Sequence, residues 1–452
     1  MEKIKPRTLS GFAEFLPGDQ VKFEKMIDVL RRTYSLFGFT SLDTPVMEAA
    51  EILLAKGGGE TEKQIYRFTK GDTDLALRFD LTVPLAKYAA LHYSDLCFPF
   101  RRYQIGKVFR GERAQRGRFR EFYQADIDII GDGGLDIINE AEIPAVIYKT
   151  FEAFGLKNFK IKINNRKILS GFFDSVVPGD KTENIMRAVD KLDKAGPEKT
   201  REFICGEGIS EKTSEEIMTF IAGAGADTPV FLEKYRGINP MFDEGLSELN
   251  TILRYLPELG VPTENFEPDL SVARGLDYYT GTVYETVITD AADIGSVCSG
   301  GRYDDLAGCY TDKKLPGVGT SIGLTRLFCT LNEQGLLSDD ILTAPCDALI
   351  LPLTEDKSAA LNCAGVFRAA GVRAQIHCEN KKLKSKLSYA DKLGVPFSVF
   401  IGEDEIKNGK ISVKDMQSGQ TVFEEAKQAA TRIKTVLNEK YSGPVIKENK
   451  NK

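Results

Sequence analysis

The stretch that most constrains the fold runs from Phe100 to Gly131. Apolar and polar residues alternate with period two on both sides of a polar loop at 111–117, which predicts two antiparallel strands joined by that loop. Because side chains alternate between the faces of a strand, one face of the second strand collects two guanidinium groups, an aromatic ring, an amide and two carboxylates. These residues are Arg118, Arg120, Phe122, Gln124, Asp126 and Asp128. The opposite face is apolar and can pack on a core.

The order of groups along this polar face favours a ligand site. Cations come first, followed by an aromatic ring and then by polar and anionic groups. A ligand with a phosphate end, a flat ring and a cationic or polar end would match this order, because the planar fork of arginine binds phosphate oxygens bidentately. The alternative is an ordinary strand whose outer face meets solvent, since exposed sheet faces are commonly polar. The strand by itself leaves both interpretations open.

The same stretch resembles motif 2 of the class II aminoacyl-tRNA synthetases, in which FRxE precedes a loop and an arginine-bearing strand. The signature here is Phe109-Arg110-Gly111-Glu112, and its form resembles that of the histidyl-tRNA synthetases. The resemblance implies that Arg110 binds the amino acid and ATP and stabilises charge during the reaction. The further roles that it implies are Glu112 beside the adenine, Arg118 on ATP, Phe122 stacked on the ring and Gln124 on the amino acid.

Composition narrows the class of protein. A chain of 452 residues predicts two or three domains, and 42% hydrophobic with 28% charged residues is typical of a soluble globular protein. The first residues lack the apolar segment of a secretory signal, and no run is long enough to span a membrane. Eight scattered cysteines and two histidines make a zinc site an unfavoured interpretation and favour a reducing, cytoplasmic location. The net charge of −6 argues against indiscriminate nucleic-acid binding but allows a local basic surface.

Two segments before the arginine-rich stretch extend the resemblance. A helical apolar pattern from Gln20 to Phe37, followed by an extended piece through Pro45, resembles motif 1, which builds the dimer interface in this class and implies a homodimer. The segment from Asp74 to Pro84 predicts a strand that, as an alternative, is simply at the surface. It resembles the loop that binds the α-amino group of histidine, a role that Asp80 and Thr82 would take.

Residues 168–266 have a different character. Helix-like segments at 182–193, 214–223 and 242–256 are separated by Gly and Pro, without a concentration of chemically active side chains. This pattern predicts a mostly helical inserted domain. Histidyl-tRNA synthetases carry such an insertion near the acceptor stem of the tRNA, although a simple spacer domain would have the same pattern.

The sequence RGLDYYTG at 274–281 is close to a signature of histidyl-tRNA synthetases. The alternative is a turn with packed aromatic rings. By resemblance, Arg274 stabilises the substrate carboxylate and the α-phosphate during adenylate formation. Tyr278 and Tyr279 would line the imidazole pocket together with Asp128. Recognition of this kind is selective, because an analogue that lacks the ring nitrogens leaves buried polar groups unpaired.

Two glycine-containing segments follow. A Gly-Gly turn at 300–301 places Tyr303, which the resemblance assigns to histidine binding. The glycines of 317–323 have the spacing GxGxxxG, which differs from the dinucleotide-binding GxGxxG and lacks the acidic residue that should follow it. The segment instead resembles motif 3, a strand of small residues and a helix. There Arg326 would hold the γ-phosphate of ATP.

From residue 343 onward the chain alternates between strand and helix patterns, which predicts a separate α/β domain with a largely parallel sheet at 343–440. It resembles the anticodon-binding domain of several class II synthetases. The lysines of 380–386 would supply phosphate contacts that give affinity without reading sequence, unless they form only a solvated helix face. Residues 441–452 are rich in Lys, Asn and Glu and are predicted to be disordered.

Taken together, these patterns predict an α+β fold: a class II synthetase-like antiparallel sheet flanked by helices, with a mostly helical insertion and a C-terminal α/β anticodon-binding domain. The catalytic domain would span 1–335, interrupted by the insertion at 168–266. The resemblance implies a histidine–tRNA ligase that uses ATP with Mg²⁺, L-histidine and tRNA(His), and the Mg²⁺ ligands are left unassigned.

Three alternatives compete with this function. A catalytically inactive regulatory subunit of ATP phosphoribosyltransferase would keep the fold, but Arg274, Arg326 and the C-terminal domain argue against it. A class II synthetase for proline, threonine or glycine would share the C-terminal domain, but RGLDYYTG and Asp128 argue against that. A plain RNA-binding module would not need an anionic pocket beside an arginine cluster.

Overall fold

The computed structural model describes residues 3–55, 60–115, 117–223, 228–273, 278–290 and 295–447 of the protein. The chain divides into two compact units. The first contains Met1–Glu14 and Ile27–Leu336, and the second contains Phe15–Met26 and Leu337–Lys452. Helix α1 (Pro17–Leu36) therefore contributes residues to both units. Among the described residues, no helix is both long enough and apolar enough to cross a membrane.

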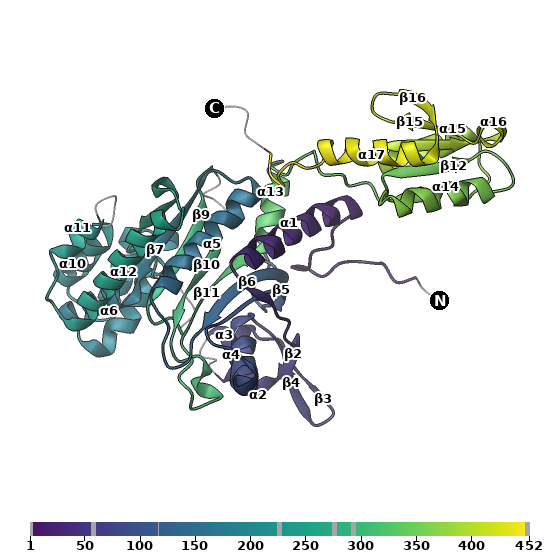
Figure 1. Ribbon diagram of the computed structural model, residues 1–452. Coiled ribbons are helices and arrows are strands. Elements are labelled where there is room, and N and C mark those ends of the chain that lie inside the picture. Colours follow the sequence, from purple (N-terminus) through teal and green to yellow (C-terminus); the bar gives the residue numbers. More distant parts are fainter. Residues whose placement is uncertain are drawn as a thin grey trace. The chain divides into compact units, whose positions relative to one another are not determined.

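The first unit is built on an eight-stranded sheet with the order β1-β5-β6-β11-β10-β9-β7-β8 (Figure 1). Its strands are β1 (Thr40–Ser41), β5 (Phe100–Phe109), β6 (Glu121–Ile130), β7 (Phe159–Asn165), β8 (Phe266–Pro268), β9 (Thr282–Ile288), β10 (Ser296–Tyr303) and β11 (Gly317–Gly323). The pairs β1–β5 and β7–β8 are parallel and the others are antiparallel. The two strands predicted from the arginine-rich stretch are β5 and β6, so the predicted α+β class with an antiparallel sheet is confirmed.

From Gln124 to Ile130, strand β6 is buried on both faces. Its apolar face is inaccessible, as expected, with Ala125, Ile127 and Ile129 all fully buried. The polar side chains of the other face are also buried, since Asp126 and Asp128 are each only 2% exposed. The interpretation of this strand as an ordinary solvent-facing one is therefore wrong. Burying carboxylates is costly unless they have partners, so their surroundings decide what this face does.

Helices cover the sheet and are tied to it by hydrogen bonds. Helices α5 (Ile138–Phe154) and α13 (Leu324–Glu333) pack against the strands. The hydroxyl of Tyr284 in β9 donates to the Glu140 carbonyl of α5 at 2.6 Å. The backbone N–H of Tyr123 in β6 donates to the Thr325 hydroxyl of α13 at 2.8 Å. These contacts fix the helices to the strands that carry the polar face.

A three-stranded sheet with the order β2-β4-β3 adjoins β5. Its strands are β2 (Met47–Ala49), β3 (Arg67–Lys70) and β4 (Thr73–Leu77), and the neighbouring helices are α2 (Ala50–Leu54), α3 (Glu60–Gln64) and α4 (Thr82–Leu91). Arg78, which is 2% exposed, connects this sheet to β5. Its guanidinium donates to the Lys107 carbonyl and to the Thr44 carbonyl, both at 2.7 Å. The turn between β4 and α4 is thereby held beside the arginine-rich strands.

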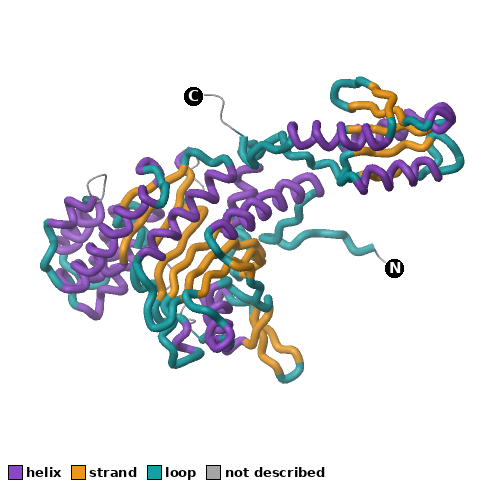
Figure 2. The backbone as a smooth tube through the Cα atoms, viewed as in Figure 1, coloured by secondary structure: helices purple, strands orange, loops and turns teal. Residues whose placement is uncertain are grey.

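The segment between β7 and β8 is helical in the structure. Its helices are α6 (Arg166–Val176), α7 (Thr182–Val189), α8 (Leu192–Ala195), α9 (Pro197–Gly206), α10 (Glu211–Ala222), α11 (Thr228–Glu233) and α12 (Pro240–Glu258). Figure 2 shows these helices gathered at one side of the first unit. The rings of Phe172 and Phe220 stack at 3.7 Å between centroids, which supplies an aromatic centre for the group. The boundaries 168–266 for a separate inserted domain stay a prediction, since the helices belong to the same compact unit as the sheet.

The second unit contains a five-stranded sheet with the order β13-β12-β14-β15-β16. Its elements are β12 (Ala348–Pro352), α14 (Ser358–Ala369), β13 (Ala374–Ile376), α15 (Leu383–Leu393), β14 (Phe397–Ile401), α16 (Glu403–Asn408), β15 (Ile411–Asp415), β16 (Thr421–Glu424) and α17 (Ala426–Lys440). The pairs β13–β12 and β12–β14 are parallel, and the pairs β14–β15 and β15–β16 are antiparallel.

Two details of this unit depart from expectation. Lys386 is only 4% exposed and its ammonium donates to the Pro352 carbonyl at 2.7 Å, so it cannot contact a nucleic-acid phosphate as the other lysines of 380–386 could. Part of the segment predicted to be a disordered tail is packed. Val445 and Ile446 are buried, and Ile446 forms a β-bridge with Leu337. Residues 448–452 lie outside the described residues.

Two glycines of β11 make room for side chains of neighbouring strands. A Cβ atom on Gly319 would overlap the Asp128 carboxylate and lie 2.5 Å from the Ile127 carbonyl oxygen. A Cβ atom on Gly317 would overlap the Tyr303 ring and lie 2.7 Å from its hydroxyl. The absence of a side chain at Gly317 and Gly319 therefore leaves the space that the buried Tyr303 and Asp128 side chains occupy.

We expect Gly319→Ala to lower the free energy of unfolding by about 1–3 kcal/mol, because a packed strand cannot make room for the methyl group without moving Asp128. Denaturant unfolding of the purified protein measures this loss. Gly134→Ala is the matched control, since a Cβ atom there meets no neighbour within 4 Å among the described residues. Equal effects of the two substitutions would contradict the packing role of Gly319.

Candidate active site

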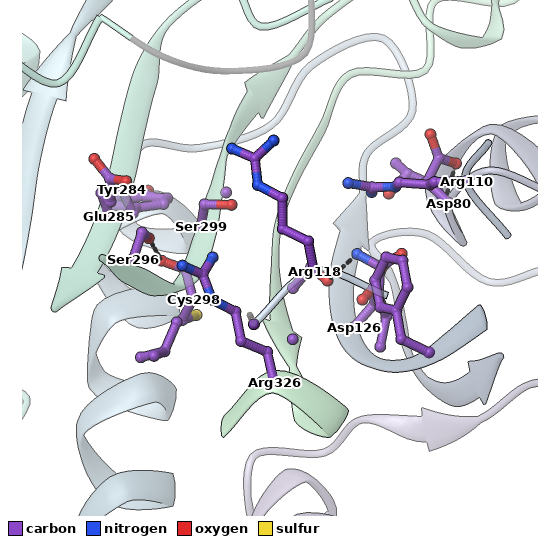
Figure 3. A pocket seen from close by; sticks show the side chains of 18 of the residues that line it. Asp80, Arg110, Arg118, Asp126, Tyr284, Glu285, Ser296, Cys298, Ser299 and Arg326 are labelled. Atoms are coloured by element: carbon purple, nitrogen blue, oxygen red, sulfur yellow. Dashed lines mark hydrogen bonds between the residues drawn. The ribbon is translucent and has the colours of Figure 1, made fainter. Parts of the chain in front are cut away.

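One cavity of about 430 Å³ in the first unit brings distant parts of the chain together. Its lining comes from the turn before α4, the arginine-bearing loop, and strands β6, β9, β10 and β11. The predicted site residues that line it are Asp80, Thr82, Arg110, Glu112, Arg118, Phe122, Gln124, Tyr278, Tyr279 and Arg326. In Figure 3, Arg110 lies near Asp80, and Arg118 and Arg326 approach from other elements. Arg274, also predicted, lies outside the described residues.

Three arginines give one part of the cavity its positive charge. The Arg110 guanidinium lies over the ring of Phe79 at 4.3 Å and over that of Phe122 at 5.2 Å. Its Nε donates to the Phe79 carbonyl at 3.2 Å, which fixes its direction. Arg118 is 3.3 Å from a Glu112 carboxylate oxygen, and Arg326 completes the group. A cluster of this kind, held partly out of water, is suited to a polyphosphate.

The turn that leads into α4 supplies a buried carboxylate. Asp80 is 6% exposed, and its Oδ1 accepts hydrogen bonds from the backbone N–H groups of Thr82 and Val83 at 3.0 and 2.9 Å. Burial raises the pKa of Asp80, although these N–H groups and the charge of Arg110 act to lower it. The carboxylate is therefore oriented by the start of the helix and faces the cavity beside the Thr82 hydroxyl. Such a pair can bind an ammonium group.

Asp126 lines the cavity, whereas Asp128 does not. The sequence could not distinguish the two residues, because both point to the same face of the strand. Asp126 lies opposite Ser321 of β11, and the Ser321 hydroxyl accepts a hydrogen bond from Gln124 at 2.7 Å. Its Oδ1 is buried and has no hydrogen-bond partner among the described residues. Burial raises the pKa of Asp126 to about 7, despite the opposing effect of the nearby Arg102 charge. A buried acceptor of this kind is available to a ligand.

Asp128 and Tyr303, both predicted to contact the substrate, are absent from the lining residues and are bonded to each other. The Tyr303 hydroxyl donates to Asp128 Oδ1 at 2.8 Å. On the other side of the carboxylate, Arg102 Nη2 is 2.7 Å from Asp128 Oδ2, with both side chains almost fully buried. Burial raises the pKa of Asp128 to about 6, and the Arg102 charge opposes that rise. Arg102 was not expected at the site, although its place opposite Asp128 follows from the pairing of β5 with β6.

The two tyrosines of the RGLDYYTG signature lie together at the cavity. Their ring centroids are 5.0 Å apart, and the Tyr278 ring meets that of Tyr303 edge-on at 5.8 Å. The Tyr278 hydroxyl is buried and has no well-oriented hydrogen-bond partner among the described residues. Burial raises the pKa of Tyr278, and the nearby Thr82 hydroxyl acts to lower it. Tyr278 thus offers a polar group to a ligand, while Tyr303 connects the pair to Asp128.

Several lining residues were missed because they lie on strands that look apolar or weakly patterned in sequence. They are Glu285, Ser296, Cys298, Ser299 and Ser321. Only the register of β9, β10 and β11 shows that they share the site with the arginine-rich strands. Asp190, at the C-terminal end of α7, also lines the cavity and was missed because its helical segment showed no concentration of chemically active side chains. No group of three or more His, Cys, Asp or Glu side chains within the described ranges is arranged to hold a metal ion.

Comparisons with known proteins identify the family of this chain. The family model described as histidyl-tRNA synthetase matches residues 11–327, and the model described as anticodon binding domain matches residues 347–435. A histidine–tRNA ligase from Clostridium tetani is 50% identical over 437 residues, which cover 96% of this chain and 99% of its own. The crystal structure of histidyl-tRNA synthetase from Nostoc sp. PCC 7120 has a TM-score of 0.87 at 39% identity and covers 96% of this chain and 100% of its own.

A more distant structure shares the fold alone. The ATP phosphoribosyltransferase regulatory subunit/histidyl-tRNA synthetase from Bacillus halodurans C has a TM-score of 0.72 at 21% identity, covering 86% of this chain and 97% of its own. A shared fold does not by itself assign a function, which has to be argued from the side chains of the cavity.

The raised pKa of Asp126 predicts a pH dependence of stability. Because the folded state keeps this proton up to a pH of about 7 whereas an unfolded carboxyl loses it near 4, the contribution of Asp126 is fully present below about pH 4 and is lost as the pH rises to about 7. We expect Asp126→Asn to gain stability relative to the wild type over this interval, by on the order of 4 kcal/mol, and to level off above it. Urea unfolding of both proteins from pH 4 to pH 8 measures the difference. A difference that stays constant with pH would contradict the assignment.

Proposed function

The chain belongs to the histidyl-tRNA synthetase family of class II aminoacyl-tRNA ligases, and on this premise we propose that it activates L-histidine with ATP and transfers it to the 3′ end of tRNA(His). The family predicted from the sequence motifs is thereby confirmed. The observation that carries the proposal is the single cavity in which an arginine cluster, a buried carboxylate at a helix start and a tyrosine pair meet. These groups match the triphosphate, the α-ammonium group and the side chain of the two substrates.

In the first step the histidine carboxylate attacks the α-phosphorus of ATP, a P–O bond forms to the amino acid, and the bond to pyrophosphate breaks. We assign Arg110 and Arg274 to the α-phosphate and the carboxylate, and Arg118 and Arg326 to the rest of the triphosphate. Their charges stabilise the negative charge that develops on the phosphoryl oxygens. The contacts of the Arg110 guanidinium with the rings of Phe79 and Phe122 hold it in position for this role. Glu112 lies next to Arg118, and we assign it to the adenine side of ATP, with Phe122 on the ring.

The amino acid would bind in the other half of the cavity. We assign Asp80 and Thr82 to the α-ammonium group and Gln124 to the amino acid. Tyr278 and Tyr279 contact the imidazole, and the buried Asp128–Tyr303 pair supports them from behind. Asp126 adds a carboxylate that the cavity exposes to the ligand. Binding of histidine would thus give partners to buried polar groups that an apolar amino acid would leave unpaired.

Magnesium enters with ATP as part of the substrate. The ion would neutralise phosphate charge and orient the triphosphate for in-line attack. Because no cluster of three suitable side chains occurs among the described residues, we assign no protein ligand to it. We therefore assign the positioning of the triphosphate by the protein to its arginines.

In the second step a hydroxyl of the terminal tRNA ribose attacks the activated carbonyl, which forms the ester and releases AMP. We propose that the second unit binds the tRNA, supported by the match of residues 347–435 to the anticodon-binding family model. Lys381, Lys382 and Lys384 are exposed and available for phosphate contacts, in contrast to Lys386. We place the reaction in the cytoplasm, and the eight free cysteines are consistent with its reducing conditions.

The regulatory-subunit alternative has no specific observation in its favour. Arginines and an ammonium-binding carboxylate all line one cavity, as an adenylate-forming enzyme requires. Both functions stay distinguishable by experiment, because only a synthetase exchanges pyrophosphate into ATP in the presence of its amino acid.

We expect amino-acid-dependent ATP–pyrophosphate exchange with histidine alone among the twenty amino acids. Arg110→Met should lower the exchange rate by about 10²–10³-fold, because it removes a charge placed for the transition state while keeping much of the stacked volume. Arg187→Ala, on the exposed face of α7, is the control and should keep the wild-type rate. Exchange with another amino acid would overturn the substrate assignment, and no exchange with any amino acid would favour the regulatory role.

We further propose that the protein is a homodimer. Apolar side chains around β2 and β3 are unusually exposed, since Val46, Met47 and Phe68 retain 42%, 46% and 43% of their accessible surface. Val46 and Met47 directly follow the predicted motif 1, and Phe68 lies on the same three-stranded sheet. Neighbouring exposed apolar side chains commonly mark an interface.

Light scattering on the purified protein should give twice the mass of one chain, and Met47→Glu should lower it toward that of a monomer. Phe203→Asp is the control, because that side chain is similarly exposed, at 48%, but lies on α9. A monomeric wild type, or a dimer indifferent to Met47→Glu, would contradict this interface.

A further inference from the structure

The N-terminal segment Leu9–Phe12, here called the strap, contacts the chain where the arginine-bearing loop enters β6. The Gly11 carbonyl accepts hydrogen bonds from the backbone N–H groups of Arg120 at 2.7 Å and Glu121 at 3.3 Å. Phe12 also forms a parallel β-bridge with Glu121. The strap closes on itself through a hydrogen bond from Phe12 N to the Leu9 carbonyl at 3.1 Å. Residues about 110 positions apart in sequence are thus joined through backbone groups alone.

The contact between Gly11 and Arg120 matters for the loop at 111–117, because Arg120 follows that loop and is hydrogen-bonded to residues at its start. The Arg120 carbonyl accepts a hydrogen bond from Arg110 N at 2.9 Å, and its side-chain Nε donates to the Glu112 carbonyl at 3.1 Å. Arg120 therefore connects the strap to both ends of the loop that carries Glu112 and Arg118. Strand β11 pairs with β6 only from Gln124 onward, so it does not hold this part of the chain.

Glycine is required at residue 11 for two separate reasons. Its φ angle is +86°, in the region that side chains with a Cβ atom rarely adopt. A Cβ atom there would also lie 2.9 Å from Arg120 Cγ and 3.1 Å from Ala114 Cβ. The close approach of the strap to the loop therefore depends on the absence of a side chain at this position.

We propose that Gly11 is a positioning residue for ATP: the strap holds Arg120, and through it Glu112 and Arg118, in the arrangement that binds the nucleotide. This inference rests on the proposed function for the identity of the nucleotide.

Among the described residues, no hydrogen bond or bridge links the strap to Asp80, Thr82 or the tyrosine pair. Arg110, which we assign to both substrates, meets the Arg120 carbonyl only through its backbone N–H, and its side chain keeps a separate hydrogen bond to the Phe79 carbonyl. The strap therefore acts on the ATP half of the cavity and leaves the histidine half unaffected.

The test compares Gly11→Ala with Gly133→Ala in pyrophosphate exchange. Gly133 is the matched control because its φ of +72° gives a similar backbone strain, while a Cβ atom there meets nothing within 4 Å among the described residues. Gly11→Ala should raise the KM for ATP by about tenfold, equivalent to about 1.4 kcal/mol, with the KM for histidine unchanged. Gly133→Ala should change neither constant. A Gly11→Ala enzyme that behaves like the control, or that raises both KM values equally, would overturn the proposal.

Two further measurements keep the test decisive. Gly11→Asn retains the steric overlap with Arg120 but tolerates a positive φ better than alanine does, so it should fold even where Gly11→Ala does not and should shift the KM for ATP in the same direction. Hydrogen exchange of the peptide covering 118–122 requires no activity, and it should be faster in Gly11→Ala than in Gly133→Ala. Unchanged exchange there would refute the strap contact, whereas a wild type without pyrophosphate exchange would refute only the proposed function.

Discussion

The buried ion pair between Arg102 and Asp128 is the interaction on which the rest of the site depends. The two side chains lie on adjacent strands, and neither has appreciable access to solvent. Removing one partner of such a pair commonly costs about 3–5 kcal/mol, because the other charge is left buried and uncompensated. Tyr303 reaches the same carboxylate from β10, and Gly319 of β11 leaves room for it. Four strands are thus arranged around one carboxylate, and three of them, β6, β10 and β11, also contribute residues to the lining of the cavity.

The polar face of β6 combines structural and ligand-binding roles along one strand. Asp128 accepts a hydrogen bond from Tyr303 at Oδ1 and is ion-paired with Arg102 at Oδ2. Asp126, two residues earlier, has an Oδ1 that is buried without a hydrogen-bond partner among the described residues. A buried acceptor without a partner is destabilising until a ligand supplies a donor. The raised pKa of both carboxyl groups reflects that cost. Stability and substrate recognition are therefore coupled within a few residues.

Much of the fold and part of the site could be predicted because their signals are local. Period-two alternation located β5 and β6, and helical spacing located α7, α10 and α12 within the segment between β7 and β8. The motif residues Asp80, Arg110, Gln124 and Arg326 do meet at one cavity. The sequence could not decide burial where it depends on partners. The polar face of β6 was left with a solvent-facing alternative, and Lys386 was grouped with exposed lysines although its ammonium donates to the Pro352 carbonyl.

The sequence by itself determined the secondary structure, the family and the chemical types of group that the site needs, because these follow from spacing along the chain. Only the tertiary structure decided which of them face the ligand. On a strand, Asp126 and Asp128 are equivalent, since both point to the same face. Their difference comes from Arg102 on β5, Tyr303 on β10 and the space left by Gly319 on β11, none of which is near them in sequence. Likewise, the contact of Gly11 with Arg120 exists only because folding brings the start of the chain to the end of the arginine-bearing loop.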